Sequence, residues 1–126
     1  MIINFTYRQI LSKLEFYREV TMQAKALCSD EPNLITNLAN VSAILFNRME
    51  QINWAGFYIV DDAIDNTRKE LVLGPFQGQP ACTRIPIGKG VCGTAVSSCE
   101  VQVIDDVHQF EGHIACDAAS NSEIVL

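Results

Sequence analysis

The residues of this sequence best suited to covalent chemistry are its five cysteines, Cys28, Cys82, Cys92, Cys99 and Cys116. No two of them form a C-x-x-C pair, the usual half of a zinc knuckle, so their spacing does not indicate a structural metal site. An odd number of cysteines without a secretory signal also argues against a framework of structural disulfides. For Cys28 and Cys99 we favour packing as small hydrophobic side chains. The other three lie beside loops punctuated by glycine, and for them the sequence leaves redox chemistry and packing both open.

The neighbours of Cys116 favour a reactive thiol. It lies in the segment GHIACDAAS, three residues after His113, whose imidazolium would stabilise a thiolate. The carboxylate of Asp117 acts in the opposite direction, because it raises the pKa of a neighbouring thiol. Together with His108, His113 and Cys116 would also offer three ligands to a metal ion, but histidines on a loop serve more often as hydrogen-bonding groups. We therefore favour thiol redox chemistry over metal binding.

The segment from Gly88 to Gly93, GKGVCG, matches the G-x-G-x-x-G pattern of dinucleotide-binding loops. That pattern requires the first strand of a parallel βαβ unit and an acidic residue about 20 positions later. Here Asp105 and Asp106 follow Gly93 by only 12 and 13 residues, and the surrounding strands read as antiparallel. We therefore interpret these glycines as forming a tight turn and the start of a helix.

Aromatic and acidic residues mark a candidate pocket. Trp54 and Tyr58 are four residues apart in one predicted strand and share a face, whereas Phe57 takes the other face. Core packing explains Phe57, but a Trp and Tyr pair can instead line a small-molecule pocket. Carboxylates such as Asp105 are normally solvated, although Glu123, which opens an apolar strand, would point into a pocket.

Two predicted helices precede, in the sequence, the strands that position these residues. Over residues 5–27 apolar side chains recur at three- and four-residue steps with charged residues between them, which is typical of an amphipathic helix. The same spacing over residues 34–49 predicts a second helix. Its candidate N-caps are Ser29 and Asp30, and Pro32 suits its first turn.

Antiparallel strands follow. Aromatic and β-branched residues at 53–60, a polar connection at 61–69 and an apolar run at 70–76 predict a hairpin with a long loop. We then expect a strand, a small helix, a strand, a long loop and a last strand, at residues 82–87, 90–98, 101–104, 105–122 and 123–126. A structureless loop of that length is usually functional. This order indicates an α+β fold rather than a doubly wound α/β sheet.

Composition places these elements in one domain, residues 1–126. With 48% hydrophobic and 19% charged residues, the chain can form one packed core and is too apolar for a disordered segment. Its net charge of −6 and its lack of a Lys/Arg cluster argue against nucleic acid and membrane partners. Because no apolar run approaches the ~20 residues of a membrane span and no signal peptide is apparent, we expect a cytoplasmic protein.

Three long motifs resemble the free methionine-(R)-sulfoxide reductases, which are single-domain enzymes of the GAF fold. They are GPFQGQPAC, GKGVCGTA and GHIACDAASNSEIV, and with the strand INWAGFYIV and the two preceding helices the resemblance covers essentially all 126 residues. It implies a GAF-like antiparallel sheet flanked by helices.

The resemblance also implies a reaction and its residues. Cys116 would be the attacking thiolate, Cys82 the resolving cysteine and Cys92 a third redox cysteine. A thiolate attacks the sulfoxide sulfur, methionine leaves, and the resulting sulfenic acid condenses with a second thiol. Thioredoxin would then reduce the disulfide, with no bound cofactor. Such chemistry belongs to the defence against oxidative stress.

The substrate, free methionine sulfoxide, carries an ammonium and a carboxylate beside its apolar S-methyl end. By the resemblance, Trp54 and Tyr58 supply an aromatic wall, while Asp105 and Glu123 belong to a cluster of carboxylates. A homodimer is left open.

Two departures from the family pattern lead to further expectations. The connection at 61–69 is longer than usual, and family members continue past the segment SEIVL with a strand hairpin and a last helix, so we expect a GAF domain that is incomplete at its C-terminal end. Two alternatives to the reductase follow, a non-catalytic GAF module that binds a small ligand and an inactive fragment. Three cysteines at the redox positions favour the reductase over a sensor.

Overall fold

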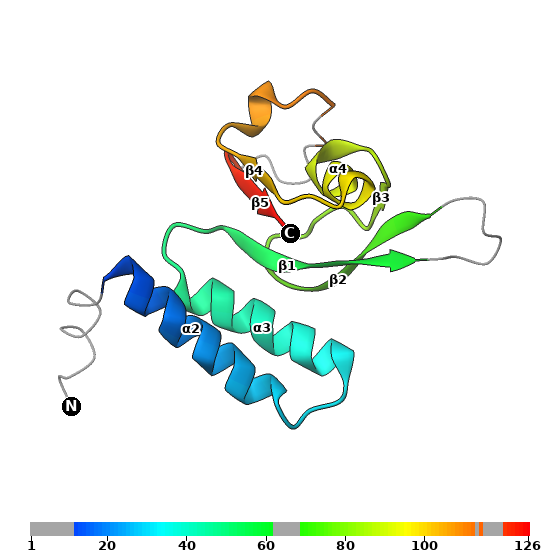
Figure 1. The fold of residues 1–126 in the computed structure, drawn as a ribbon. Helices are drawn as coiled ribbons and strands as arrows, with labels where there is room; N and C mark the ends of the chain where they lie inside the picture. Colours follow the sequence, from blue (N-terminus) through cyan, green and yellow to red (C-terminus); the bar gives the residue numbers. More distant parts are fainter. Residues whose placement is uncertain (1–11, 62–68, 113, 115–119) are drawn as a thin grey trace.

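Two helices form a hairpin at one side of the molecule (Figure 1). The computed structural model describes residues 12–61, 69–112, 114 and 120–126. Helix α2 (Lys13–Cys28) begins with a capping box, in which the Ser12 N–H donates to Glu15 Oε2 at 2.9 Å and the Glu15 N–H donates to Ser12 Oγ at 3.3 Å. Helix α3 (Leu34–Arg48) packs on α2 and on the sheet. Both predicted helices are confirmed over the described residues.

The predicted cap of α3 is wrong. Its N-cap is Asn33, whose Oδ1 accepts from the Thr36 N–H at 3.0 Å. Ser29 instead caps the C-terminus of α2, and its hydroxyl donates back to the Ala26 carbonyl at 3.1 Å. Pro32 therefore precedes the helix rather than lying in its first turn.

The strands form two antiparallel sheets in the described part of the chain. Strands β1 (Trp54–Asp61), β2 (Glu70–Gly78) and β3 (Arg84–Pro86) lie in the order β1-β2-β3, and β4 (Gln102–Ile104) pairs with β5 (Glu123–Val125). Helix α4 (Gly90–Ser98) packs against β3, β4 and β5. The predicted loop at 105–122 contains a short 3₁₀ helix, η1 (Val107–Gln109). The α+β class is confirmed.

Sheet and helices are arranged in layers (Figure 1), with the α2–α3 hairpin on one side of β1 and β2 and with α4, β4 and β5 on the other. The core residues come from every layer: Val20, Ile44, Ala55, Leu71, Ile85, Val91, Ala95 and Val107 are all buried. The fully buried Ser42 of α3 ties two layers together, because its Oγ lies 2.8 Å from the Leu38 carbonyl and 3.1 Å from the Pro75 carbonyl of β2.

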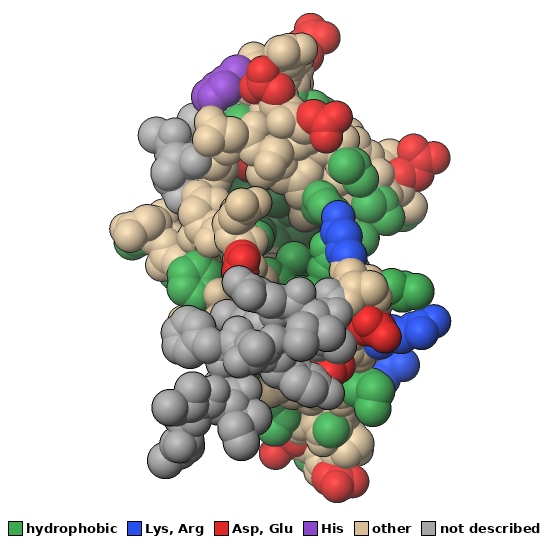
Figure 2. All heavy atoms as spheres, turned by 90° about the vertical axis from the view of Figure 1, so that its left-hand side faces the viewer, with side chains coloured by type: hydrophobic (Ala, Val, Ile, Leu, Met, Phe, Trp, Pro, Cys, Tyr) green, Lys and Arg blue, Asp and Glu red, His purple; other side chains and the backbone are tan. Residues whose placement is uncertain are grey.

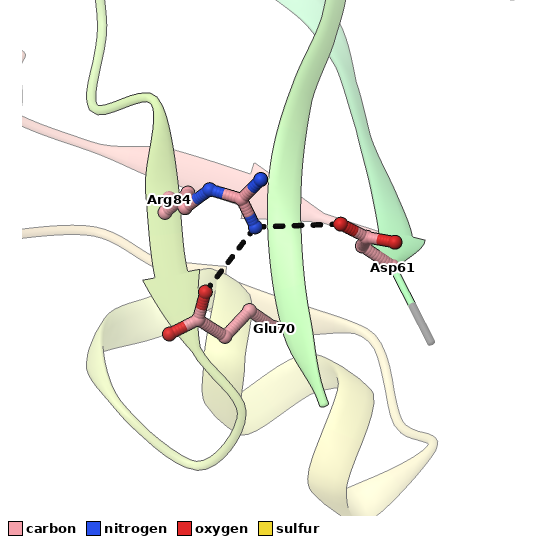
Figure 3. A network of polar contacts seen from close by, with 3 residues as sticks. All are labelled: Asp61, Glu70 and Arg84. Carbon is pink, nitrogen blue, oxygen red and sulfur yellow. Dashed lines mark hydrogen bonds and ion pairs between the residues drawn. The ribbon is translucent and has the colours of Figure 1, made fainter. Parts of the chain in front are cut away.

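A polar network links the three strands at the end of the β1–β2 hairpin (Figure 3). Arg84 Nη1 lies 3.3 Å from Asp61 Oδ2 and 3.3 Å from Glu70 Oε2, so one guanidinium links β1, β2 and β3. All three side chains are partly exposed, and ion pairs of this kind stabilise a fold by less than about 1 kcal/mol. We assign this network a structural role.

Candidate active site

Three aromatic side chains from β1 and β2 stack on one face of the hairpin. The Trp54 ring lies between Tyr58, with ring centroids 6.2 Å apart, and Phe76, with centroids 5.5 Å apart. The interplanar angles of 25° and 14° are those of stacked rings. The prediction that Trp54 and Tyr58 share a face is confirmed, and their rings form a continuous apolar wall.

A glycine that our sequence analysis missed makes this stack possible. Gly56 lies between Trp54 and Tyr58 on the same face and pairs with Phe76 in the sheet. A Cβ at Gly56 would lie 2.3 Å from the Cβ of Phe76 and 2.7 Å from Cη2 of Trp54, closer than atoms can approach. The signal in the sequence was a glycine inside an aromatic strand, which often marks a close approach of other atoms.

The Tyr58 hydroxyl connects this wall to a redox candidate. It donates a hydrogen bond of 2.7 Å to the backbone carbonyl of Cys82, which lies in the segment between β2 and β3. Cys82 is half-buried and disulfide-bonded. By contrast, Cys28, Cys92 and Cys99 are free.

The second redox candidate, Cys92, lies in the first turn of α4 and is half-buried. The turn before it is tight: Gly88 and Gly90 have positive φ angles of 85° and 63°, and a Cβ at Gly93 would lie 2.5 Å from the Pro86 carbonyl oxygen. Because β3 is antiparallel to its neighbour, this is no dinucleotide-binding unit. The interpretation of the glycines as a turn and helix start is confirmed.

A third group, the Glu123 carboxylate, interacts electrostatically with Cys92 and Tyr58. Burial, and then the charge of Glu123 on β5, raise the pKa of Cys92 to about 11, against the smaller opposing effect of a backbone hydrogen bond. Burial, Cys92 and Glu123 likewise raise the pKa of Tyr58 to about 12. Three groups from β1, α4 and β5 therefore interact as one cluster, and both Tyr58 and Cys92 are protonated at neutral pH.

The other predicted carboxylate, that of Asp105, lies next to the β4–β5 ladder. Ile104 pairs with Glu123 across the β4–β5 ladder, and Asp105 follows it directly with an exposed side chain. Asp105 thus lies at the same end of this sheet as Glu123. Its role in a pocket stays a prediction.

Cys116, with His113 and Asp117, lies outside the described residues, so its predicted role is not tested by the geometry. Described residues on either side of it do have defined neighbours. Ile114 lies against the start of α4, where its Cγ1 would be 3.2 Å from a Cβ at Gly90. Ser120 lies beside the start of β1, where its Oγ accepts from Asn53 Nδ2 at 3.1 Å.

Other kinds of site find little support among these residues. Within residues 12–61, 69–112, 114 and 120–126, no three His, Cys, Asp or Glu side chains are placed to hold a metal ion. None of the described helices combines the length and the apolar character needed to cross a membrane. On the face shown in Figure 2, acidic side chains are scattered and the visible basic side chains form no broad patch.

The fold defines the class. A solved structure described as the GAF domain aligns with this chain at a TM-score of 0.83 and 41% identity, covering 91% of this chain and 66% of that one. The chain is thus a GAF-domain protein, and the predicted GAF-like fold is confirmed. No protein-family model matches the chain.

Relatives narrow the class to a family. The chain is 56% identical over 116 residues to the free methionine-R-sulfoxide reductase of Escherichia coli, covering 92% of this chain and 67% of that protein. It is 42% identical over 127 residues to the Saccharomyces cerevisiae enzyme of that name, covering 98% and 69%. The solved Neisseria meningitidis enzyme in complex with its substrate aligns at a TM-score of 0.82 and 46% identity, over 90% of this chain and 65% of that one. The chain belongs to the free methionine-R-sulfoxide reductase family of oxidoreductases, and it spans about two thirds of the length of these relatives.

Proposed function

We propose that this chain carries the site that reduces free L-methionine (R)-S-oxide to methionine. The observation that carries the proposal is the cluster of Tyr58, Cys92 and Glu123 beside the Trp54 ring. It offers an apolar wall, a thiol and a carboxylate at one place, contributed by three elements. A small substrate with an S-methyl group at one end and an ammonium at the other is complementary to that combination.

In the proposed reaction Cys116 is the nucleophile. Its thiolate attacks the sulfoxide sulfur and the oxygen takes up a proton. The hydroxyl group then passes from the substrate sulfur to the Cys116 sulfur, so the substrate S–O bond breaks, the methionine thioether leaves and Cys116 becomes a sulfenic acid. The thiol of Cys82 then attacks that sulfenic acid, and a disulfide forms with release of water. The bonding state of the described cysteines supports Cys82 as the resolving cysteine, because Cys82 is disulfide-bonded while Cys28, Cys92 and Cys99 are free.

Different groups of the protein would bind the two ends of the substrate. Trp54 and Tyr58 form the wall for the S-methyl group. Glu123, with Asp105 beside its strand, would pair with the ammonium group, because a carboxylate in a partly buried site binds a cation more strongly than one in water.

Turnover needs a reductant that returns the disulfide to two thiols. We propose thioredoxin, whose low reduction potential suits this step, and no bound cofactor. A reducing compartment such as the cytoplasm keeps this cycle running. Light scattering would measure the oligomeric state separately and test whether the chain forms a homodimer.

The test is a thioredoxin-coupled assay with three substrates: the R and S epimers of free methionine sulfoxide and the N-acetylated R epimer. We expect turnover of the free R epimer alone, and a preference of about 10³ over the N-acetylated compound, because its uncharged amide cannot form an ion pair with the partly buried Glu123 carboxylate. Comparable rates on the free and N-acetylated substrates would contradict the proposed binding mode. Binding of the free R epimer without turnover would favour the alternative, a non-catalytic GAF module.

A further inference from the structure

The segment that carries Cys82 is held by two neighbouring strands. In the β1–β2 register Tyr58 lies opposite Leu73, and the Leu73 N–H donates to the Thr83 carbonyl at 3.0 Å. The Tyr58 side chain spans β2 and donates its own hydrogen bond of 2.7 Å to the adjacent carbonyl, that of Cys82. One backbone bond and one side-chain bond therefore fix two successive peptide units just before β3.

The donor is itself fixed in place. The Tyr58 ring is stacked on Trp54, which is stacked in turn on Phe76, so its hydroxyl has little freedom to leave the carbonyl. Burial and two neighbouring acidic groups, Cys92 and Glu123, raise the pKa of Tyr58 to about 12. The phenol consequently remains a donor throughout the neutral and mildly alkaline range.

We infer that the Tyr58 hydroxyl is a positioning group for the resolving cysteine, because it holds the Cys82 backbone where its sulfur forms the disulfide and so stabilises the disulfide relative to the two thiols. This role is distinct from that of the Tyr58 ring, which lines the apolar wall. Its importance for turnover rests on the proposed function, whereas its effect on the Cys82 disulfide does not.

The redox equilibrium with glutathione measures this effect directly. Two glutathione thiols reduce the Cys82 disulfide to two protein thiols and become one glutathione disulfide, so atoms and electrons balance. A hydrogen bond that holds Cys82 in place raises the effective concentration of its thiol at its partner. Since one such bond is worth a few-fold to about tenfold in an equilibrium constant, Tyr58→Phe should make the disulfide about three to ten times easier to reduce.

The experiment uses the full chain with Cys28→Ser and Cys99→Ser, which removes two free thiols that would form mixed disulfides. This parent and its Tyr58→Phe variant are equilibrated with graded ratios of reduced and oxidised glutathione, quenched in acid and alkylated. Mass spectrometry of the Cys82 peptide then gives the oxidised fraction. The control is Ser42→Ala, which removes a fully buried hydroxyl bonded to the Leu38 and Pro75 carbonyls and should lower the melting temperature without touching Cys82.

We expect a threefold to tenfold shift for Tyr58→Phe and less than a twofold shift for Ser42→Ala. An unchanged equilibrium in Tyr58→Phe, or an equal shift in Ser42→Ala, would overturn the inference, because the effect would then be absent or merely one of stability. The reductase assay on the parent is read separately. If the parent is inactive but Tyr58→Phe still shows the shift, the proposed function is refuted and the positioning role stands. If the parent is active and Tyr58→Phe shows no shift, the positioning role is refuted and the proposed function stands.

Discussion

The Cys92 thiol lies in surroundings that oppose its ionisation. It is half-buried in the first turn of α4, and burial and then the charge of Glu123 raise its pKa to about 11 from an ordinary 9.0. The thiolate is the reactive form of cysteine, so at neutral pH Cys92 is a poor nucleophile. This environment argues that Cys92 does not make the first attack and that its redox role, where it has one, follows the attack by another cysteine.

Replacing Glu123 tests the origin of this effect. In Glu123→Gln the negative charge that repels the thiolate is gone, so the pKa of Cys92 should fall from about 11 while staying above its ordinary value, because burial is the larger cause. The thiolate absorbance of the Cys28→Ser, Cys99→Ser chain in its disulfide form, followed against pH, measures this shift. An unchanged titration would mean that Glu123 does not act on Cys92.

The two proposed redox partners should differ in single-turnover experiments. Cys116→Ser should release no methionine, because the nucleophile is missing. Cys82→Ser should release about one methionine per chain and then stall under thioredoxin, unless Cys92 resolves the sulfenic acid in its place. Quantifying methionine in the absence of reductant distinguishes the two variants, and equal loss in both would contradict the assigned roles.

At the scale of the elements, β1 does the most to position the site. Its alternation places Trp54, Gly56 and Tyr58 on one face, and the missing side chain of Gly56 gives the indole its space. Opposite this position β2 carries one extra residue, since the pairing shifts between Gly56 and Tyr58. Such an irregularity increases the local twist and can redirect side chains.

Gly56→Ala should therefore displace the Trp54 ring and destabilise the fold by about 1–3 kcal/mol, the range expected for overpacking. Chemical denaturation measures the stability, and the tryptophan fluorescence of the folded protein reports the ring. Gly88→Ala is the matched control, because it strains a backbone with φ of 85° where nothing lies within 4 Å of the new Cβ. It should lose stability with its fluorescence unchanged, and a fluorescence change of the same size in both variants would refute the role of Gly56.

Local patterns in the sequence were enough to predict the helices and strands. Features that depend on contacts between residues distant in the sequence could not be predicted. Apolar periodicity identified both helices, and alternation identified the face shared by Trp54 and Tyr58. The cap of α3 was missed because several residues before that helix could serve, and only the structure shows that Asn33 reaches the Thr36 N–H. The bond from Tyr58 to Cys82 ends on a backbone carbonyl, which every residue has, so residue types give no sign of it.

At the scale of the whole molecule, the candidate site joins parts that meet only through tertiary packing. Tyr58 belongs to the β1-β2-β3 sheet, Glu123 belongs to the β4–β5 sheet, and Cys92 lies on the helix that packs against both sheets. A ligand that contacts the aromatic wall and the Glu123 carboxylate together would bridge the two sheets. Its binding free energy should then add to the stability of the entire fold.

Thermal unfolding of the disulfide form tests this coupling, because without a reductant the substrate is bound and not consumed. At about 100 times its dissociation constant, free methionine-R-sulfoxide should stabilise the chain by about 2.7 kcal/mol, seen as a higher melting temperature. At the same concentration the N-acetylated compound should give a much smaller increase, since it has no ammonium group to pair with Glu123. In Glu123→Gln the two compounds should become nearly equal. If they already act equally on the unsubstituted chain, Glu123 does not bind the ammonium group and the proposed orientation of the substrate is wrong.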